Sequence, residues 1–420
     1  MRRRNFLKNG AILMVGMATT PLIYPFPNKG LFIGKEERVT SPLKNNLQVL
    51  VLDGLPRERG QIHGEALRSK IKEAINRWKE FFPKFKHMNH DEYISKFLEE
   101  TNFLPAIKKW TPDLLEEVKG IGEGAGVDFK TIYAYQLMDE EWLFRRKTAL
   151  EAADQEGCNC SSLGVFKQAS IPVMVAQNMD IPNYADGFQV LLHIKHPNSS
   201  LEILAFTYTG LIILNGMNSR PVGVCCNTLS QLNYSFDGLP VAFVLRGILQ
   251  QPNHEEAVRF IHQIKHASGQ NYIIGGKEKV SDYECSANKV SRFIPYDGAN
   301  RVYHTNHPFV NDDRSIYREI QKKLSQEKET QESSNSEIRF RSLEARLRDP
   351  EKIITVETVK SVLSSHDYPK HPVCRHRIPE RRAMTLGSTI MVLSSSPEMI
   401  LAPGPPCLTE YMRYKFSSDS

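Results

Sequence analysis

The chain has 420 residues, enough for one large core or for two domains, and its 40% hydrophobic and 24% charged residues are ordinary for a globular protein. It holds 54 basic and 48 acidic residues, and four of the bases lie within the first eight positions, which leaves a balance of 50 to 48 over the rest. This near-balance excludes the basic composition of a general nucleic-acid-binding protein, so no nucleic-acid partner is expected.

The N-terminus has the pattern of an export signal. Residues 3–8 read RRNFLK and precede an apolar run over residues 11–24, which resembles a twin-arginine signal, with an ordinary Sec signal as the alternative. A glycine and a proline interrupt the run, which is short for a membrane span. No A-x-A cleavage site follows. We expect residues 1–26 to direct export to the periplasm or the cell exterior, with the protein either released or anchored by an uncleaved signal.

The segment 27–159 is predicted to be mainly helical. After a strand at 47–53, apolar residues recur at helical spacing between Gly64 and Phe82. Further helices are predicted over 90–100, 113–124 and 129–146. The apolar faces of these helices need a partner, so we expect the segment to stay associated with the rest of the chain.

From residue 160 to residue 420 the pattern changes to strands, then helices, then strands. Strands are predicted over 161–166, 173–178, 188–193, 201–209, 211–215, 223–227, 271–275, 280–285, 292–297, 388–394 and 399–402. Helices are predicted over 239–249, 254–262, 312–328, 338–347 and 356–364, with a polar insertion over 326–336. Several strands are apolar on both sides, as in sheets covered on both faces. This order favours an α+β fold with two sheets between helical layers.

The seven cysteines indicate one reactive thiol among buried ones. They occupy positions 158, 160, 225, 226, 285, 374 and 407, an odd number at irregular spacing that makes a poor disulfide framework. The close pairs at 158/160 and 225/226 lack the C-x₂-C spacing and the paired histidines of zinc sites. Neither a metal nor another cofactor is therefore expected.

Two neighbouring strands carry the candidate chemistry. Cys160-Ser161-Ser162 opens the first, and residues 176–180, reading AQNMD, end the second twenty residues later. If the two strands pair antiparallel, Asp180 returns towards Cys160.

These motifs resemble the N-terminal-nucleophile (Ntn) hydrolases, above all the acyl-coenzyme A:6-aminopenicillanic acid acyltransferase family, with choloylglycine hydrolases and acid ceramidases as more distant relatives. Members of the family begin their catalytic chain with Cys-[Thr/Ser]-[Ser/Thr], followed by Gly-[Gln/Arg]-Asn-x-Asp, in which Ala176 here replaces the glycine. Further segments match in order, at 216–227, 304–308, 336–340, 386–389 and 402–407. The resemblance covers about residues 47–412 and implies a four-layer αββα sandwich.

A cysteine at a newly made chain start carries its own base. A free thiol has a pKa of about 8.5, and an α-amino group has one of about 7.7–8.0, so the amine suits the task of taking the thiol proton. The resemblance implies that the bond before Cys160 is cut by the chain itself. Cys158 is the alternative, since it follows a glycine, but the Ser-Ser-aliphatic continuation begins at Cys160.

The resemblance also assigns the remaining site residues. Asp180 would orient the amine, Gln177 would line the pocket, Asn227 and Asn306 would stabilise the oxyanion through a backbone and a side-chain N–H, and Arg339 would neutralise the carboxylate region. The structural alternatives are a turn aspartate at 180, strand-end or turn asparagines at 227 and 306, and an ion-pair arginine at 339.

The expected function is that of an autoproteolytically activated cysteine amidohydrolase or acyltransferase. It would cleave linear amides through an acyl-enzyme thioester. Its partners would be a small acyl amide, an acyl-coenzyme A or amine acceptor, and its own cleaved N-terminal segment as a small subunit. Two alternatives remain open: a papain-type cysteine peptidase, which needs a helix after the nucleophile, and an exported binding protein with an intact Asn159–Cys160 bond.

Overall fold

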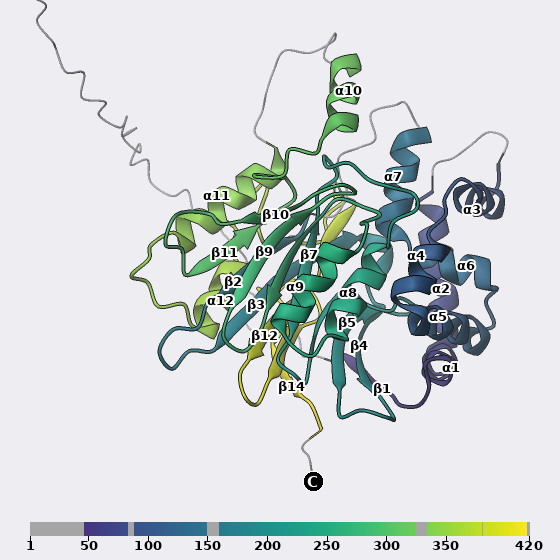
Figure 1. The fold of residues 1–420 in the computed structure, drawn as a ribbon, viewed down its shortest axis with the longest axis horizontal. Helices are drawn as coiled ribbons and strands as arrows, with labels where there is room; N and C mark the ends of the chain where they lie inside the picture. The colour runs from purple at the N-terminus through teal and green to yellow at the C-terminus, as the bar shows by residue number, and fades with distance from the viewer. Residues whose placement is uncertain (1–45, 83–87, 149–158, 325–333, 380, 418–420) are drawn as a thin grey trace, which may run out of the picture. The chain divides into compact units, whose positions relative to one another are not determined.

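The computed structural model of the chain describes residues 46–82, 88–148, 159–324, 334–379 and 381–417 (Figure 1). The predicted export signal, Cys158 and most of the predicted polar insertion lie outside these residues. Within the described part of the chain, no helix is both long and apolar enough to cross a membrane.

Two sheets form the centre of the fold. The larger has the strand order β1 (Gln48–Leu52), β4 (Gln189–Lys195), β5 (Glu202–Tyr208), β6 (Asn215–Asn218), β7 (Gly223–Thr228), β8 (Gln270–Gly275), β9 (Val280–Cys285) and β10 (Val290–Phe293). The smaller has the order β11 (Arg301–His304), β2 (Ser161–Val165), β3 (Val173–Pro182), β12 (Ala383–Leu393), β13 (Glu398–Ala402) and β14 (Met412–Lys415). Only the β1–β4 pair of these ladders is parallel.

The two sheets pack face to face, so closely that glycine is required between them. A Cβ on Gly164 of β2 would lie 2.6 Å from Val280 Cγ2 and 2.9 Å from Ile273 Cγ2, both in the larger sheet. Strands such as β2 and β3 are buried along their whole length, because each sheet is covered on both faces.

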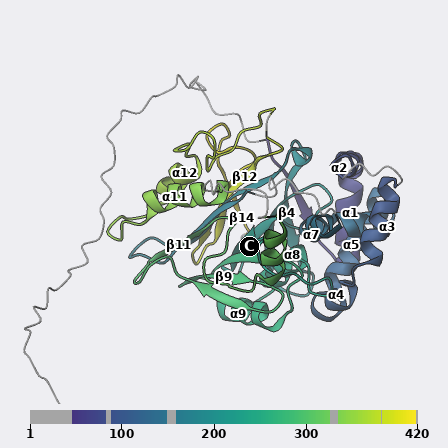
Figure 2. The same cartoon turned by 90° about the horizontal axis from the view of Figure 1, so that it is seen from above.

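Helices cover the outer faces of both sheets. Helices α8 (Val241–Leu249) and α9 (His254–Gln263) pack on β6, β7 and β8 of the larger sheet, whereas α11 (Asn335–Leu347) and α12 (Val356–Leu363) pack on β11, β3 and β12 of the smaller one (Figures 1 and 2). The order of layers is helix, sheet, sheet, helix, and the αββα prediction is confirmed.

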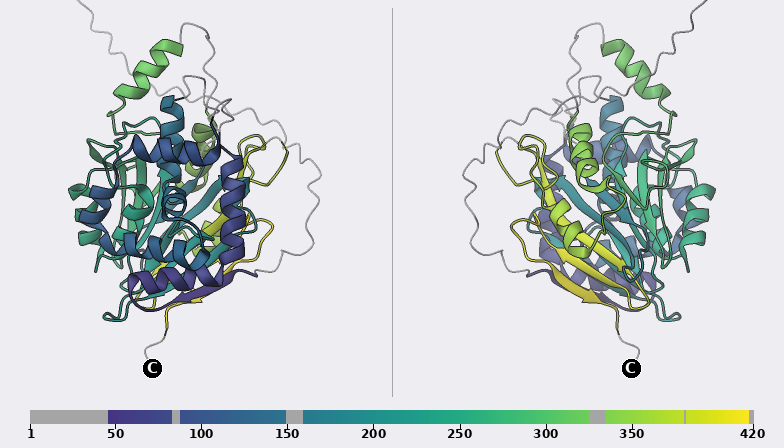
Figure 3. Two further views of the ribbon diagram at one scale, coloured as in Figure 1. Left: turned by 90° about the vertical axis from the view of Figure 1, so that its right-hand side faces the viewer. Right: turned by 90° about the vertical axis from the view of Figure 1, so that its left-hand side faces the viewer.

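The N-terminal helices gather at one side of the sandwich, where Figures 2 and 3 show them next to the edge formed by β1. They are α1 (Pro56–Ala66), α2 (Arg68–Glu80), α3 (His90–Glu99), α4 (Leu104–Trp110), α5 (Pro112–Ala125), α6 (Phe129–Tyr135) and α7 (Met138–Thr148). This N-terminal part of the chain is joined to the sandwich by strand pairing and by a buried ion pair. Strand β1 pairs with β4, and buried Glu117 of α5 accepts hydrogen bonds of 2.8 and 3.0 Å from Arg246 of α8.

Several predicted elements differ from the structure, and the predicted helix 129–146 is divided into α6 and α7 by a break at residues 136–137. The predicted strand 211–215 is wrong, because residues 211–214 are irregular after a turn at Thr209 and Gly210 (φ +86) and the strand begins at Asn215. The predicted strand 292–297 ends at Phe293, two residues before Pro295, which has no N–H for a ladder. Strand β12 begins at Ala383 rather than 388 and continues through an irregularity between Thr385 and Gly387. Strands β11 and β14 and helix α4 were not predicted, and α10 (Ser315–Leu324) begins at Ser315 rather than at residue 312.

Candidate active site

Cys160 lies directly before strand β2, at the centre of the sandwich. Strands β2 and β3 pair antiparallel with Ser161 opposite Asn178, which sets Cys160 opposite Met179. Its Sγ is 3.5 Å from Met179 Sδ and 3.9 Å from the backbone oxygen of Asp180. The predicted return of the second strand to the cysteine is confirmed. A strand, not a helix, follows Cys160, which is the opposite of what a papain-type nucleophile requires.

The Cys160 side chain lines a small cavity inside the sandwich. Most of the wall is apolar and comes from five further regions of the chain: Gln136, Met138, Asp139, Met179, Ile181, Leu211, Ile213, Leu214, Cys226, Thr228, Val241, Ala242 and Leu245. The segment 211–214, mistaken for a strand, is apolar because three of its side chains form this wall. A mostly apolar pocket with few polar groups is typical of a small-molecule site.

Arg339 of α11 binds the backbone of the candidate nucleophile. Its Nη1 donates to the Cys160 carbonyl oxygen at 2.5 Å and to Ser161 Oγ at 2.9 Å. Its Nη2 donates to Asn306 Oδ1 at 2.9 Å, and its Nε donates to Asn335 Oδ1 at 2.7 Å. Burial lowers the pKa of Arg339 to about 10, so the guanidinium stays charged at neutral pH. The arginine therefore fixes the position of the Cys160 backbone.

Asp180 is fully buried and incompletely bonded. Its Oδ1 accepts a hydrogen bond of 2.7 Å from Thr385 Oγ1, whereas Oδ2 lies 4.0 Å from Arg375 Nε and has no hydrogen-bond partner among the described residues. Burial raises the pKa of Asp180 to about 6, although the guanidinium groups of Arg375 and Arg339 lower it. A buried acceptor without a donor is unfavourable, and it marks a place where another donor would be stabilising.

Gln177 does not line the cavity, contrary to the prediction. Its Nε2 donates to the Cys226 carbonyl and, at 3.3 Å, to Asn227 Oδ1, while its Oε1 accepts from Asn215 Nδ2 at 2.9 Å. Asn227 Nδ2 donates in turn to Ser162 Oγ at 2.5 Å. Gln177 and Asn227 thus belong to a polar network that joins the facing strands β2, β3, β6 and β7.

Asn306 follows strand β11 and connects the arginine to the edge of the cavity. Its Oδ1 accepts from Arg339, and its Nδ2 donates at 3.1 Å to the backbone oxygen of Thr228, a residue of the cavity wall. Its backbone N–H donates to Ser336 Oγ at 2.7 Å. The structure therefore brings Asn306, Arg339 and Cys160 into one hydrogen-bonded chain.

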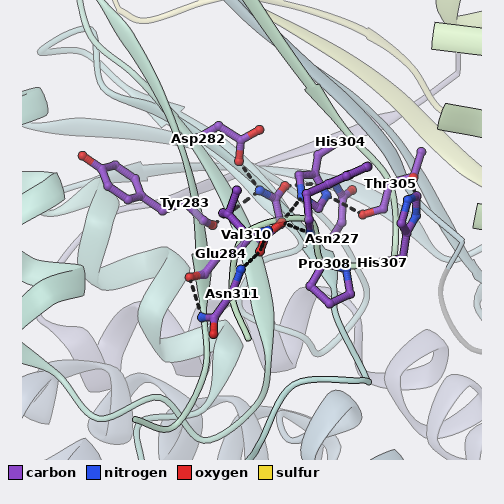
Figure 4. A network of polar contacts seen from close by, with 12 residues as sticks. Asn227, Asp282, Tyr283, Glu284, His304, Thr305, His307, Pro308, Val310 and Asn311 are labelled. Atoms are coloured by element: carbon purple, nitrogen blue, oxygen red, sulfur yellow. Dashed lines mark hydrogen bonds and ion pairs between the residues drawn. The ribbon is translucent and has the colours of Figure 1, made fainter. Parts of the chain in front are cut away.

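A second polar network, drawn in Figure 4, extends from Asn227 through Asn271 to buried acidic residues on β9. Glu284 binds His304 at 3.1 Å and accepts three backbone N–H bonds from residues 309–311. Burial disfavours a charge on His304, but the carboxylates of Asp282 and Glu284 outweigh it and raise the pKa of His304. These contacts make His304 part of the scaffold that positions the residues beside Asn306.

The sequence analysis did not identify two buried acidic residues, Asp139 and Glu140, of which Asp139 lines the cavity. Asp139 of α7 lines the cavity, and its Oδ2 accepts hydrogen bonds from Thr228 Oγ1 at 2.7 Å and Gln270 Nε2 at 2.5 Å. Its neighbour Glu140 is also fully buried, and burial raises the pKa of both carboxyl groups, that of Glu140 to about 8. The run of three consecutive acidic residues at 139–141, within a helix predicted to pack against the core, was the sequence feature that could have indicated them.

Comparison with a family model described as "Acyl-coenzyme A:6-aminopenicillanic acid acyl-transferase" gives a match over residues 168–397, more than half of the chain. The match contains Gln177, Asp180, Asn227, Asn306 and Arg339 and begins after Cys160.

Two curated proteins of Dictyostelium discoideum are similar in sequence. Protein dcd1A is 27% identical over 241 residues, and Protein dcd1B is 26% identical over 234 residues. The matches cover 50% of this chain and 51% and 44% of the two proteins, so the chain spans about half the length of these relatives.

Solved structures with similarity include a variant of conjugated bile acid hydrolase from Clostridium perfringens, with a TM-score of 0.36, 13% identity and coverage of 61% of this chain and 97% of that chain. Penicillin V acylase from Agrobacterium tumefaciens has a TM-score of 0.33, 16% identity and coverage of 58% and 82%. Scores this low carry no argument about chemistry.

Proposed function

The chain belongs to the acyl-coenzyme A:6-aminopenicillanic acid acyl-transferase family, and from this we propose that it is an exported cysteine amidohydrolase or acyltransferase, activated by cutting its own Asn159–Cys160 bond. One observation carries the proposal: the Cys160 thiol lines an apolar cavity at the start of a buried strand, while a buried arginine holds the carbonyl of the same residue. A cut at this point would create an amine beside the thiol.

Activation would need only the thiol and one water. The Cys160 thiol attacks the carbonyl carbon of Asn159, the bond from that carbon to the Cys160 nitrogen breaks, and the thiol proton moves to the nitrogen. Water then hydrolyses the thioester, which restores the thiol and leaves Asn159 with a carboxylate. Because Asn159 and Cys160 are both buried, no other protease could reach this bond without local unfolding.

In the mature site, the new α-amine would take the thiol proton, and the thiolate would attack the acyl carbon of an amide. The amine product leaves with that proton, and an acyl thioester remains on Cys160. Water or an acceptor amine then takes the acyl group. Asp180 supports this scheme, because its unpartnered oxygen is an acceptor suited to the new ammonium group.

Asn306 and Asn227 are the proposed oxyanion donors. Asn306 Nδ2 already lies at the cavity edge, bound to the Thr228 carbonyl. A donor of this kind contributes roughly 2.7–4 kcal/mol to the transition state. Asn227 would act through its backbone N–H, since its side chain is engaged with Ser162 and Asn271.

The cavity favours an apolar acyl group. Methionine, leucine, isoleucine and valine side chains form most of its wall, and no basic side chain is among its lining residues. An acyl chain that carries a carboxylate would meet Asp139 without a compensating cation. We therefore expect neutral, fatty or aromatic acyl amides to be better substrates than dicarboxylic ones.

The cleaved N-terminal segment would remain bound as a small subunit. Its strand β1 pairs with β4, and its Glu117 is buried in an ion pair with Arg246. Breaking a buried pair of this kind costs about 3–5 kcal/mol. Two polypeptides that co-elute in native chromatography are therefore expected.

The test is intact-mass spectrometry combined with an acyl-amide panel. Wild-type protein should give two fragments, the second beginning at Cys160, and should trap one acyl group per chain. Cys160→Ala should stay whole and inactive. Cys285→Ala is the matched control, because Cys285 is a buried cysteine outside the cavity and its variant should still cleave and turn over. A wild-type protein that stays whole yet hydrolyses amides refutes the activation step, and a fragment beginning at Cys158 moves the nucleophile by two residues.

A further inference from the structure

Four metal-binding side chains converge between two loops of the smaller sheet. His366, Cys374 and His376 lie between α12 and β12, and Cys407 lies between β13 and β14. One ligand atom from each lies within 4.8 Å of all the others. The sequence analysis weighed only the cysteine pairs 158/160 and 225/226, so it did not detect this cluster.

The four ligand atoms lie close to the separations of tetrahedral coordination, with one sulfur–nitrogen distance shorter and one slightly longer. Cys374 Sγ and Cys407 Sγ are 3.4 Å apart, and the two histidine Nε2 atoms are 3.3 Å apart. Cys407 Sγ lies 2.8 Å from His376 Nε2 and 3.9 Å from His366 Nε2. Zn–S bonds of about 2.3 Å and Zn–N bonds of about 2.0–2.1 Å separate the ligands of a tetrahedron by roughly 3.3–3.8 Å.

We propose that His366, Cys374, His376 and Cys407 form a Cys₂His₂ site that binds one structural Zn²⁺ ion. Two thiolates and two imidazoles in tetrahedral array are the donor set that zinc prefers. All four positions are filled by protein ligands, which leaves none for water or substrate. The site is therefore structural rather than catalytic.

The zinc ion would hold two loops together beside the candidate active site. Arg375, between two of the ligands, lies 4.0 Å from Asp180 Oδ2, and its backbone N–H donates to Thr385 Oγ1 at 2.9 Å. Thr385 Oγ1 in turn donates to Asp180 Oδ1. Neither loop segment around these ligands is helix or strand, so a metal crosslink would supply rigidity that the backbone ladders do not.

A disulfide is the competing explanation for the two cysteines. Their Sγ atoms are 3.4 Å apart, longer than the 2.03–2.05 Å of an S–S bond. A disulfide would also leave unexplained why two imidazole nitrogens lie next to the same sulfur.

The experiment measures metal content in the purified full-length protein. Wild type should contain one equivalent of zinc, and replacement by cobalt should give the visible absorption of tetrahedral, thiolate-bound Co²⁺. Cys374→Ala and His376→Ala should each lose the bound zinc. Cys285→Ala is the matched control, because Cys285 is equally buried but outside the cluster, and it should keep the full equivalent.

A second measurement on wild type covers the case in which the variants fail to fold. Adding a strong chelator should make two more thiols reactive towards a maleimide, and peptide mapping should identify them as Cys374 and Cys407. Zinc well below one equivalent after expression with added zinc overturns the proposal. So does a mapped Cys374–Cys407 disulfide, or an unchanged pair of thiols after chelation. These results do not depend on acyl-transfer activity, so they are separate from the test of the proposed function.

Discussion

The buried carboxyl group of Glu140 should make the free energy of unfolding depend on pH. Glu140 Oε1 accepts hydrogen bonds from the Val241 N–H at 3.0 Å and from Ser268 Oγ at 2.8 Å, while Oε2 has no partner among the described residues. Burial, reinforced by the charge of Asp139, raises the pKa of Glu140 from 4.5 to about 8. The folded protein therefore holds this proton more tightly than the unfolded chain. Its contribution to stability is complete below pH 4.5 and is lost as the pH rises through about 8.

The substitution Glu140→Gln copies the protonated side chain and removes the titration. A shift from 4.5 to about 8, at about 1.36 kcal/mol per pKa unit, makes the variant more stable than wild type by about 4 kcal/mol at pH 8 and by about 2 kcal/mol at pH 6. Near pH 4.5 the two proteins should be equally stable, because wild-type Glu140 is then neutral in the folded state.

Urea unfolding across this pH range is the assay, with the midpoint and slope converted to a free energy at each pH. Glu344→Gln serves as the control, because Glu344 lies at the surface in an ion pair with Arg348, and such pairs contribute only about 0–1 kcal/mol. A difference between Glu140→Gln and wild type that does not widen from about pH 5 to pH 8 would refute the reasoning.

Three further predictions concern the site and its support. The wild-type rate should rise with pH as Asp180 ionises and orients the ammonium group, at a pH below the value of about 6 that the uncut chain gives its pKa, and Asp180→Asn should lose this limb and about 100-fold in kcat, measured as a pH–rate profile. Arg339→Met should lower the free energy of unfolding by about 1–3 kcal/mol in urea titrations and slow self-cleavage in mass spectra, because the buried Cys160 carbonyl loses its charged donor, whereas Arg339→Lys should lose less. Gly164→Ala should cost about 1–3 kcal/mol in the same titration, since the new methyl meets Val280, and Val280→Ala should restore part of it.

The local pattern of the sequence predicts the central strand pair because the information lies within one short stretch. The pairing of β2 with β3 follows from two apolar runs separated by a short connection, and this alone brings Asp180 next to Cys160. Periodicity places Gln177 on the same face of β3 as Met179 and Ile181, which line the cavity. Its position along the strand decides the difference, because its side chain bonds instead to Asn215 and Asn227 of the facing sheet.

The local sequence patterns could not predict contacts between segments that lie far apart in the chain. Thr385 binds Asp180 across 205 positions, and Arg339 binds the Cys160 carbonyl across 179. The apolar segment 211–214 was mistaken for a strand because a cavity wall and a buried strand both consist of large apolar side chains. Each of these features is decided by tertiary packing, on which local propensity has little influence.

The electrostatics of the site give cleavage a thermodynamic consequence. In the uncut chain, Asp180 is buried, lacks a donor on Oδ2 and has a raised pKa, so its ionised form is unfavourable. A cut before Cys160 would create a positive ammonium group whose N–H bonds suit that oxygen, and the ion pair would lower the pKa of Asp180 towards its ordinary value. Near neutral pH, the cut chain would therefore bind this carboxylate more favourably than the precursor does. Asp180, which would orient the catalytic amine, would therefore also stabilise the cut chain relative to the precursor and so favour self-cleavage.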